Sequence, residues 1–90
     1  MEISVVLCTY NNEDRLQITL ESLYNLNTPE GAEWELIAVD NNSTDNTEDV
    51  IRAFEGRLPL TYVYEPQQGK SRALNTGIEV AQGELIVFTD

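Results

Sequence analysis

The carboxylate of Asp40 follows a continuous run of apolar residues, 36–39, and precedes two asparagines. Such a short apolar run is typical of a strand buried on both faces, as in a parallel sheet covered by helices. Ser43, Thr44 and Asp45 come next and supply side-chain acceptors that suit the first turn of a helix. We therefore expect Asp40 at the carboxyl end of a strand, where open α/β sheets bind their ligands.

Two roles are open to Asp40. Its carboxylate can accept hydrogen bonds from an amide or a hydroxyl of a ligand. It can instead cap the helix that starts near Thr44, or stabilise its own turn through Asn42 and Ser43. The position of the residue in the sequence is compatible with both roles.

Thr9, Tyr10 and Asn11 form a second candidate, because they follow the apolar stretch 3–8. An aromatic ring beside small polar groups at a strand end can stack on a nucleotide base and hydrogen-bond the edge of that base. The alternative is an ordinary loop that leads into a helix cap.

The segment Gly69-Lys70-Ser71-Arg72 holds two of the five basic residues at the expected start of a helix. Positive charge and free backbone N–H groups at a helix N-terminus suit a diphosphate, and the alternative is a solvated basic pair. Residues two apart point in different directions on a helix, so we select Lys70 as the ligand contact.

Asp90 follows the mainly apolar run 85–89 and is a further strand-end carboxylate. Mg²⁺ and Mn²⁺ prefer oxygen donors, so Asp90 is the candidate metal ligand of this chain. Such a site needs a second carboxylate after residue 90.

The composition excludes several classes of protein. The chain has 90 residues, with 16 acidic and 5 basic ones, and its net charge of −11 argues against a nucleic acid or an anionic membrane as partner. Histidine is absent, as are the Gly-x-Gly-x-x-Gly motif and the P-loop. The single cysteine, Cys8, leaves no internal disulfide and predicts a cytoplasmic location. No apolar run is long enough to cross a bilayer, and attachment to a membrane would need segments beyond residue 90.

Strands are predicted over residues 3–8, 34–39, 60–64 and 84–89, which are rich in apolar and β-branched residues. Helices are predicted over 13–26, 44–55 and 70–81, with a Pro- and Gly-containing turn over 27–31. The helical residues expected to face the core are Leu16, Leu20, Leu23, Tyr24, Leu26, Val50, Ile51, Phe54, Ala73, Leu74, Gly77, Ile78 and Ala81. The order βαβαβαβ predicts an α/β fold with a Rossmann-like, mostly parallel sheet, helices on both faces and the strand 60–64 near an edge.

Taken together, the motifs resemble the N-terminal, nucleotide-sugar-binding part of inverting family 2 glycosyltransferases, which have a GT-A fold. The matching motifs are Ser4-Val-Val-Leu-Cys-Thr9-Tyr10-Asn11, Leu20-Glu-Ser-Leu23, Val39-Asp40-Asn-Asn-Ser43-Thr44-Asp45-Asn-Thr47, Gly69-Lys-Ser71, Ala73-Leu-Asn75-Thr-Gly77 and Ala81-Gln-Gly83-Glu-Leu-Ile-Val-Phe-Thr-Asp90. The resemblance covers the whole chain in order. It implies that residues 1–90 are one donor-binding part, truncated from a longer enzyme and inactive in sugar transfer on its own.

The resemblance also implies roles for individual residues. The nucleotide-sugar contacts that it implies are Thr9, Tyr10, Asn11, Glu13, Asp40, Asn42, Lys70 and Asp90. Asp40 matches the carboxylate that reads the base, usually uracil, through its ring N–H. Asp90 matches the first member of the Asp-x-Asp motif, which holds the ribose and an Mn²⁺ or Mg²⁺ ion. The expected donor is a UDP-sugar, and the sugar would be transferred to a hydroxyl group of an unknown acceptor. A truncated domain would also expose an open sheet edge, which favours self-association.

A phospho-acceptor signalling domain with a flavodoxin-like sheet is the second hypothesis, because it also places carboxylates at strand ends. Such a receiver needs an acidic pair after its first strand and an acceptor Asp after its third. The corresponding segments of this chain are Thr9-Tyr10-Asn11 and Tyr64-Glu65-Pro66. A sugar nucleotidyltransferase, which shares the sheet, should carry a Gly-rich loop after the first strand, and none is present.

Overall fold

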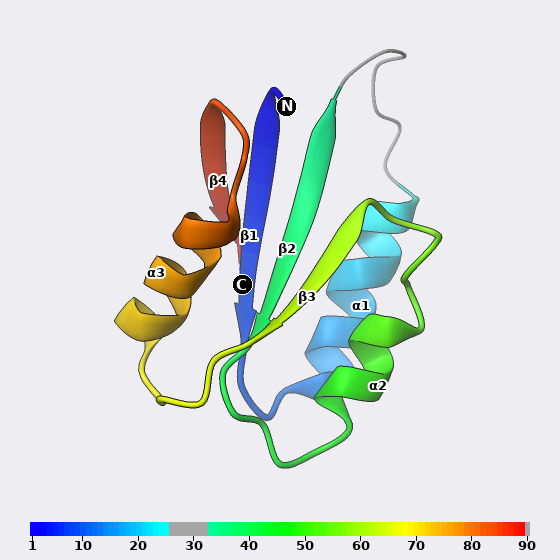
Figure 1. Ribbon diagram of the computed structural model, residues 1–90. Coiled ribbons are helices and arrows are strands. Elements are labelled where there is room, and N and C mark those ends of the chain that lie inside the picture. The colour runs from blue at the N-terminus through cyan, green and yellow to red at the C-terminus, as the bar shows by residue number, and fades with distance from the viewer. Residues whose placement is uncertain (26–32, 90) are drawn as a thin grey trace.

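The computed structural model describes residues 1–25 and 33–89 (Figure 1). The elements follow one another as β1 (Ile3–Thr9), α1 (Glu13–Tyr24), β2 (Trp34–Asp40), α2 (Thr47–Arg52), β3 (Leu60–Tyr64), α3 (Lys70–Val80) and β4 (Leu85–Thr89). The strands form one sheet in the order β3-β2-β1-β4, and every pair is parallel. The predicted α/β fold with alternating strands and helices is confirmed, and β3 lies at an edge as predicted.

The register of the sheet brings the candidate residues to one end of it. Thr9 pairs with Asp40, and Asp40 in turn pairs with Tyr64. The carboxyl ends of three neighbouring strands are therefore level, and the loops that follow them leave the sheet side by side (Figure 1).

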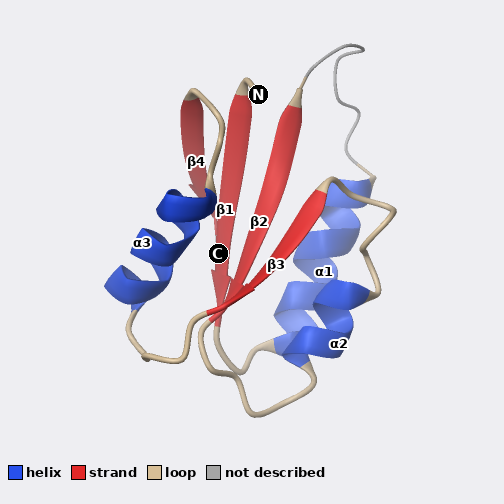
Figure 2. Cartoon of the chain, viewed as in Figure 1, coloured by secondary structure: helices blue, strands red, loops and turns tan. Residues whose placement is uncertain are grey.

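Helices cover both faces of the sheet, with α1 and α2 on one face and α3 on the other (Figure 2). Alternate residues of the inner strands point to opposite faces, so each face has its own apolar core. The core under α1 and α2 consists of Leu7, Leu16, Leu20, Leu36, Ala38, Ile51, Phe54 and Leu58. The core under α3 consists of Val6, Ile37, Val39 and Ala73.

Helix α3 packs closely on the sheet because Gly77 has no side chain. A Cβ atom at this position would lie 2.5 Å from a methyl carbon of Val6 and 3.3 Å from one of Val39. The close approach buries Ala73 and Gly77 and leaves Ile78, one residue further around the helix, exposed. The prediction that Ile78 faces the core is therefore wrong.

Helix α2 is shorter than predicted, running over Thr47–Arg52 in place of residues 44–55. It begins late because the N–H of Thr44 is bonded to the side-chain oxygen of Asn11, at 2.7 Å, and the Asp45 carboxylate accepts the N–H of Thr47, at 3.1 Å. After Arg52 the chain continues in tighter turns that reach Gly56, whose φ is 86°.

One further prediction on α1 is wrong, since Tyr24 is exposed while Leu16 and Leu20 are buried. The Tyr24 ring lies 5.9 Å from the guanidinium of Arg57. Leu26 and the turn predicted over 27–31 lie outside the described residues. Within the described part of the chain, no helix has the length and apolar character needed to span a membrane.

Candidate functional site

The loops after β1 and β2 are joined by the side chain and backbone of Asn11. The N–H of Asn11 donates to Ser43 Oγ at 2.9 Å, and Asn11 Oδ1 accepts the N–H of Thr44 at 2.7 Å. Asn11 adopts a positive φ of 45°, a conformation that asparagine tolerates better than most residues. This predicted ligand contact therefore holds two loops together in the structure.

Asp40 has both carboxylate oxygens engaged within the protein. Its Oδ1 accepts the N–H of Ser43 at 3.0 Å, and its Oδ2 accepts the hydroxyl of Tyr62 at 2.8 Å. The side chain is 3% exposed. The structure thus shows the turn-stabilising role that the sequence left open, while the base-reading role stays a prediction.

Tyr62 supports Asp40 from β3. Burial, together with the neighbouring Asp40 carboxylate, raises the pKa of the Tyr62 hydroxyl well above its usual value. The guanidinium of Arg52 lies 4.6 Å from the centre of the Tyr62 ring, on the side of α2. The hydroxyl therefore stays protonated and remains a donor to Asp40 at physiological pH.

Asn41 was not selected from the sequence, yet it makes three hydrogen bonds across the carboxyl ends of the strands. Its Nδ2 donates to the carbonyl oxygens of Glu65, at 3.2 Å, and Gln67, at 2.8 Å. Its Oδ1 accepts the N–H of Gly69 at 3.0 Å. Asn41 is 6% exposed and fixes the loop that leads into α3.

Asn42 fastens the same loop from its outer side. Its Nδ2 donates to the carbonyl oxygen of Pro66 at 3.2 Å, and its Oδ1 accepts the hydroxyl of Tyr64 at 2.6 Å. Its φ of 61° again lies in the left-handed region. Consecutive asparagines therefore determine the path of residues 65–69, and this path decides where Lys70 stands.

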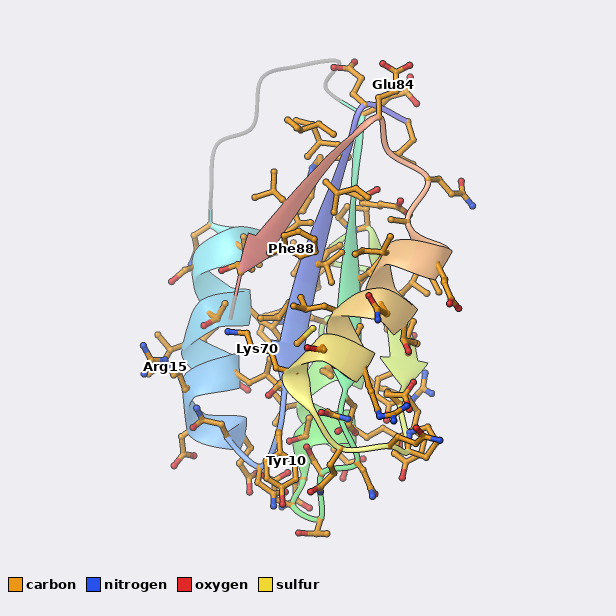
Figure 3. All side chains as sticks on the ribbon, turned by 90° about the vertical axis from the view of Figure 1, so that its left-hand side faces the viewer. Tyr10, Arg15, Lys70, Glu84 and Phe88 are labelled. Carbon is orange, nitrogen blue, oxygen red and sulfur yellow. The ribbon has the colours of Figure 1, made fainter. Side chains whose placement is uncertain are left out.

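A hollow of about 350 Å³, which we call the β1–α3 hollow, opens where β1 and β2 end beside the start of α3. Its lining residues are Cys8, Thr9, Tyr10, Asn41, Gln68, Gly69 and Lys70. Tyr10 is half exposed at the end of β1, and Lys70 extends from the first turn of α3 (Figure 3). The hollow is open to solvent and combines an aromatic ring, an amide, a hydroxyl and a cation.

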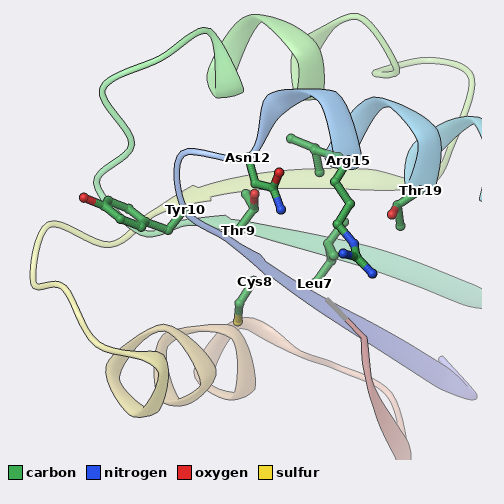
Figure 4. Close-up of a pocket in the computed structure, with 8 residues that line it drawn as sticks. Leu7, Cys8, Thr9, Tyr10, Asn12, Arg15 and Thr19 are labelled. Atoms are coloured by element: carbon green, nitrogen blue, oxygen red, sulfur yellow. The ribbon is translucent and has the colours of Figure 1, made fainter.

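A second hollow, of about 240 Å³, lies on the α1 side of β1 (Figure 4). We call it the β1–α1 hollow, and its lining residues are Leu7, Cys8, Thr9, Tyr10, Asn12, Arg15, Leu16 and Thr19. The two hollows share Cys8, Thr9 and Tyr10, so they meet over the end of β1.

Six of the eight predicted site residues fall into two groups. Thr9, Tyr10 and Lys70 line the β1–α3 hollow, whereas Asn11, Asp40 and Asn42 hold the loops around it. Glu13, at the start of α1, donates its N–H to Asp45 at 3.3 Å and lines neither hollow.

Asn41 and Gln68 are lining residues that the sequence reasoning missed. The only signals were their positions, Asn41 directly after a strand-end carboxylate and Gln68 directly before the glycine that precedes α3.

The candidate metal ligand, Asp90, lies outside the described residues. Among the residues that the structure does describe, no group of three or more His, Cys, Asp or Glu side chains is arranged to hold a metal ion.

The fold is that of an α/β domain, and both hollows lie at the carboxyl ends of its parallel strands, where open α/β sheets commonly bind ligands. The sequence model described as glycosyl transferase family 2 matches residues 4–90. The chain belongs to this family, which confirms the resemblance seen in the sequence.

Individual proteins of known structure or activity agree with this assignment. Validoxylamine A glucosyltransferase of Streptomyces hygroscopicus subsp. limoneus is 38% identical over 91 residues, which are 98% of this chain and 20% of that protein. The structure of mannosyltransferase PcManGT from Pyrobaculum calidifontis in complex with GDP-Man and Mn²⁺ superposes with a TM-score of 0.85 at 32% sequence identity. The match covers 94% of this chain and 26% of the PcManGT chain. The structure of S. aureus TarS 1-349 in complex with UDP-GlcNAc superposes with a TM-score of 0.82 at 30% sequence identity. The match covers 100% of this chain and 26% of the TarS chain.

These neighbours identify the fold as GT-A, as predicted. The chain spans between 14% and 34% of the length of the first curated relatives that it matches. The family assignment decides between the two hypotheses in favour of the glycosyltransferase. The structure agrees with it, because a phospho-acceptor needs an accessible carboxylate, whereas Asp40 is buried and accepts two hydrogen bonds.

Proposed function

We propose that this chain forms the donor-binding part of a metal-dependent, inverting glycosyltransferase, which transfers a sugar from a nucleoside diphosphate to an acceptor hydroxyl. The observation that carries the proposal is the β1–α3 hollow, where the aromatic ring of Tyr10 and the cation of Lys70 line one opening. A nucleotide has the matching chemistry, with a flat base at one end and a diphosphate at the other.

The base would lie against Tyr10 at the end of β1. Stacking of a base on an aromatic side chain contributes about 1–3 kcal/mol and is tolerant of base identity. Thr9 and Asn41 supply polar atoms beside the ring, and Asp40 fixes the turn that presents Asn41. A direct contact of Asp40 with the ring N–H of uracil stays a prediction, and each oxygen of Asp40 has a second lone pair that could accept it beside Ser43 or Tyr62.

The diphosphate would lie at the start of α3. The first N–H groups of a helix have no partner within that helix, and they attract anions together with the helix dipole. Gly69 precedes α3 with a φ of 138°, a conformation that a glycine adopts without strain. Lys70 adds a positive charge at this same point.

A divalent cation, Mn²⁺ or Mg²⁺, would neutralise charge on the leaving nucleoside diphosphate. Asp90 is the residue of this chain that would contribute to holding it. The presence of Mn²⁺ with GDP-Man in the structure of PcManGT supports this part of the proposal. The base that deprotonates the acceptor is not assigned to any residue of this chain, so we expect residues 1–90 alone to bind donor without transferring sugar.

Calorimetric titration of the chain with UDP and with GDP, each in the presence and absence of Mn²⁺, tests the proposal. We expect Lys70→Gln to weaken UDP binding by roughly tenfold, the size of one charge-assisted hydrogen bond. Arg72→Gln is the matched control, because it removes the same charge from the same helical turn but lies outside the β1–α3 hollow. Equal losses in both variants would show a nonspecific charge effect and contradict the proposed site.

Self-association is proposed through β4, which is an edge strand of the sheet. Its residues Leu85, Val87 and Phe88 are exposed, and Leu85–Thr89 contains none of the charges or prolines that protect natural edges. Sedimentation of the chain and of Val87→Lys tests this, and the substitution should yield monomer. The predicted cytoplasmic location is likewise a proposal, which fractionation of expressing cells tests.

A further inference from the structure

A carboxylate at the end of β3 holds the loop that leads into α3. Glu65 directly follows Tyr64, the last residue of β3, and its backbone N–H donates to the carbonyl oxygen of Asp40 at 2.9 Å. Its carboxylate accepts the backbone N–H of Gln67 at 2.8 Å and also accepts the hydroxyl of Thr76. One residue therefore connects the end of the sheet, the loop and α3.

The contact with α3 is made far from the start of that helix. Thr76 lies six residues after Lys70, which is about 9 Å along the helix axis. The next residue, Gly77, packs on Val6 of the sheet. The two contacts together fix the rotation of α3 about its axis, and this rotation decides where Lys70 and the first N–H groups of the helix point (Figure 1).

Neither Glu65 nor Thr76 lines the β1–α3 hollow, whereas residues 68–70, which follow Gln67 in the loop, do. The Thr76 hydroxyl and the Gln67 N–H hold the pKa of Glu65 below its usual value, so its carboxylate is ionised at neutral pH and accepts both hydrogen bonds. An effect of Glu65 on a ligand in the hollow must therefore pass through the loop and α3.

We propose that Glu65 is a positioning residue for the diphosphate of the donor, acting through the Gln67 N–H and the Thr76 hydroxyl on the start of α3. This inference rests on the proposed function, which places the diphosphate at Lys70. Hydrogen bonds weaken steeply when the donor is misdirected, so a small displacement of α3 costs contacts with the diphosphate. Tyr10 stands at the end of β1, so its contact with the base does not depend on the position of α3.

Titrations of the chain with UDP and with uridine, followed by amide NMR, separate these two contacts, because uridine carries the base without the diphosphate. Thr76→Val removes the hydroxyl at nearly constant volume, and Thr76→Ser is the matched control that keeps it. We expect Thr76→Val to weaken UDP binding by roughly threefold to tenfold, the size of one hydrogen bond, with uridine binding unchanged. Thr76→Ser should bind both ligands as the wild type does.

A second pair of variants tests Glu65 itself. Glu65→Ala and Glu65→Gln both remove one negative charge, and this alone favours an anionic ligand. A glutamine can accept the Gln67 N–H and donate to the Thr76 hydroxyl, whereas an alanine makes neither contact. We expect Glu65→Ala to bind UDP roughly tenfold more weakly than Glu65→Gln, with equal uridine binding. Adding Thr76→Val to Glu65→Ala should cause no further loss, because both changes remove the same contact.

Amide peak dispersion shows that each variant is folded, and the ratio of UDP to uridine affinity then decides the outcome. A ratio that stays at the wild-type value in Thr76→Val, or that falls equally in Glu65→Gln and Glu65→Ala, would overturn the positioning role. Equal weakening of both ligands would show a general structural effect and overturn it as well. A wild-type chain that binds UDP no better than uridine would contradict the diphosphate site of the proposed function, and the role of Glu65 with it.

Discussion

Asn41→Asp is the substitution that most sharply tests how the β1–α3 hollow is built. The change replaces one nitrogen by oxygen and leaves the size of the side chain almost unchanged. Asn41 now donates to the carbonyl oxygens of Glu65 and Gln67 and accepts the N–H of Gly69. An aspartate keeps only the last of these bonds and places its charge against both carbonyl oxygens.

The expected loss follows from these contacts. Two neutral hydrogen bonds contribute about 1–3 kcal/mol together, and the unpaired carbonyl oxygens and the buried carboxylate add to that loss. We expect the free energy of unfolding to fall by about 2–4 kcal/mol. For a domain of this size, that change lowers Tm by at least roughly 8 °C.

Thermal unfolding followed by circular dichroism at neutral pH measures the effect. Asn42→Asp is the matched control, since it adds the same charge one residue away. The Asn42 side chain donates one hydrogen bond to the loop, to the carbonyl oxygen of Pro66, and this bond is more exposed to solvent. Asn42→Asp should therefore lower the free energy of unfolding by about 1 kcal/mol or less. Equal Tm values for the two variants, or a wild-type Tm for Asn41→Asp, would refute the role given to Asn41.

Three further predictions concern stability. Gly83→Ala should destabilise the chain by about 1–3 kcal/mol in urea unfolding, because its Cβ would lie 2.5 Å from the backbone nitrogen of Ser4. Because the pKa of the Tyr62 hydroxyl is raised in the folded chain, this hydroxyl stabilises the fold fully below about pH 10 and loses its effect as the pH rises further. Tyr62→Phe should therefore flatten the decline in the free energy of unfolding above about pH 10. The Thr47 hydroxyl lowers the pKa of Asp45, so the ionised Asp45 stabilises the fold above about pH 4 and this stabilisation is lost as the pH falls. In Thr47→Val the free energy of unfolding should therefore decline less steeply in acid.

The buried strands were predictable because their sequence alone satisfies the requirement of a covered parallel sheet. Residues 36–39 are all fully buried in β2, and the carboxylate that follows them stands at the end of the strand. The bounds of α2 were not predictable in the same way. Thr44 is of a residue type that often starts a helix, but its N–H donates a hydrogen bond to Asn11 Oδ1, and Asn11 lies 33 residues earlier in the chain.

The site was harder to predict than the fold because neighbouring residues at a strand end point to opposite faces. Asp40 turns toward Tyr62 and the side of α2, whereas Asn41 turns toward the loop before α3 and lines the hollow. The sequence places both residues at the ligand-binding edge of the sheet and does not say which of them lines the hollow. That choice depends on partners more than twenty residues away in the chain.

The most direct test of the central claim is a map of UDP binding by amide NMR on the chain, with and without Mn²⁺, using Asp40→Asn for comparison. Our account predicts shifts that cluster at Thr9, Tyr10, Asn41 and Lys70, and that weaken in Asp40→Asn, where an NH₂ group replaces the oxygen that accepts the Tyr62 hydroxyl. A well-dispersed spectrum that UDP leaves unchanged, or shifts confined to the opposite end of the sheet, would contradict the assignment of the β1–α3 hollow as the donor site.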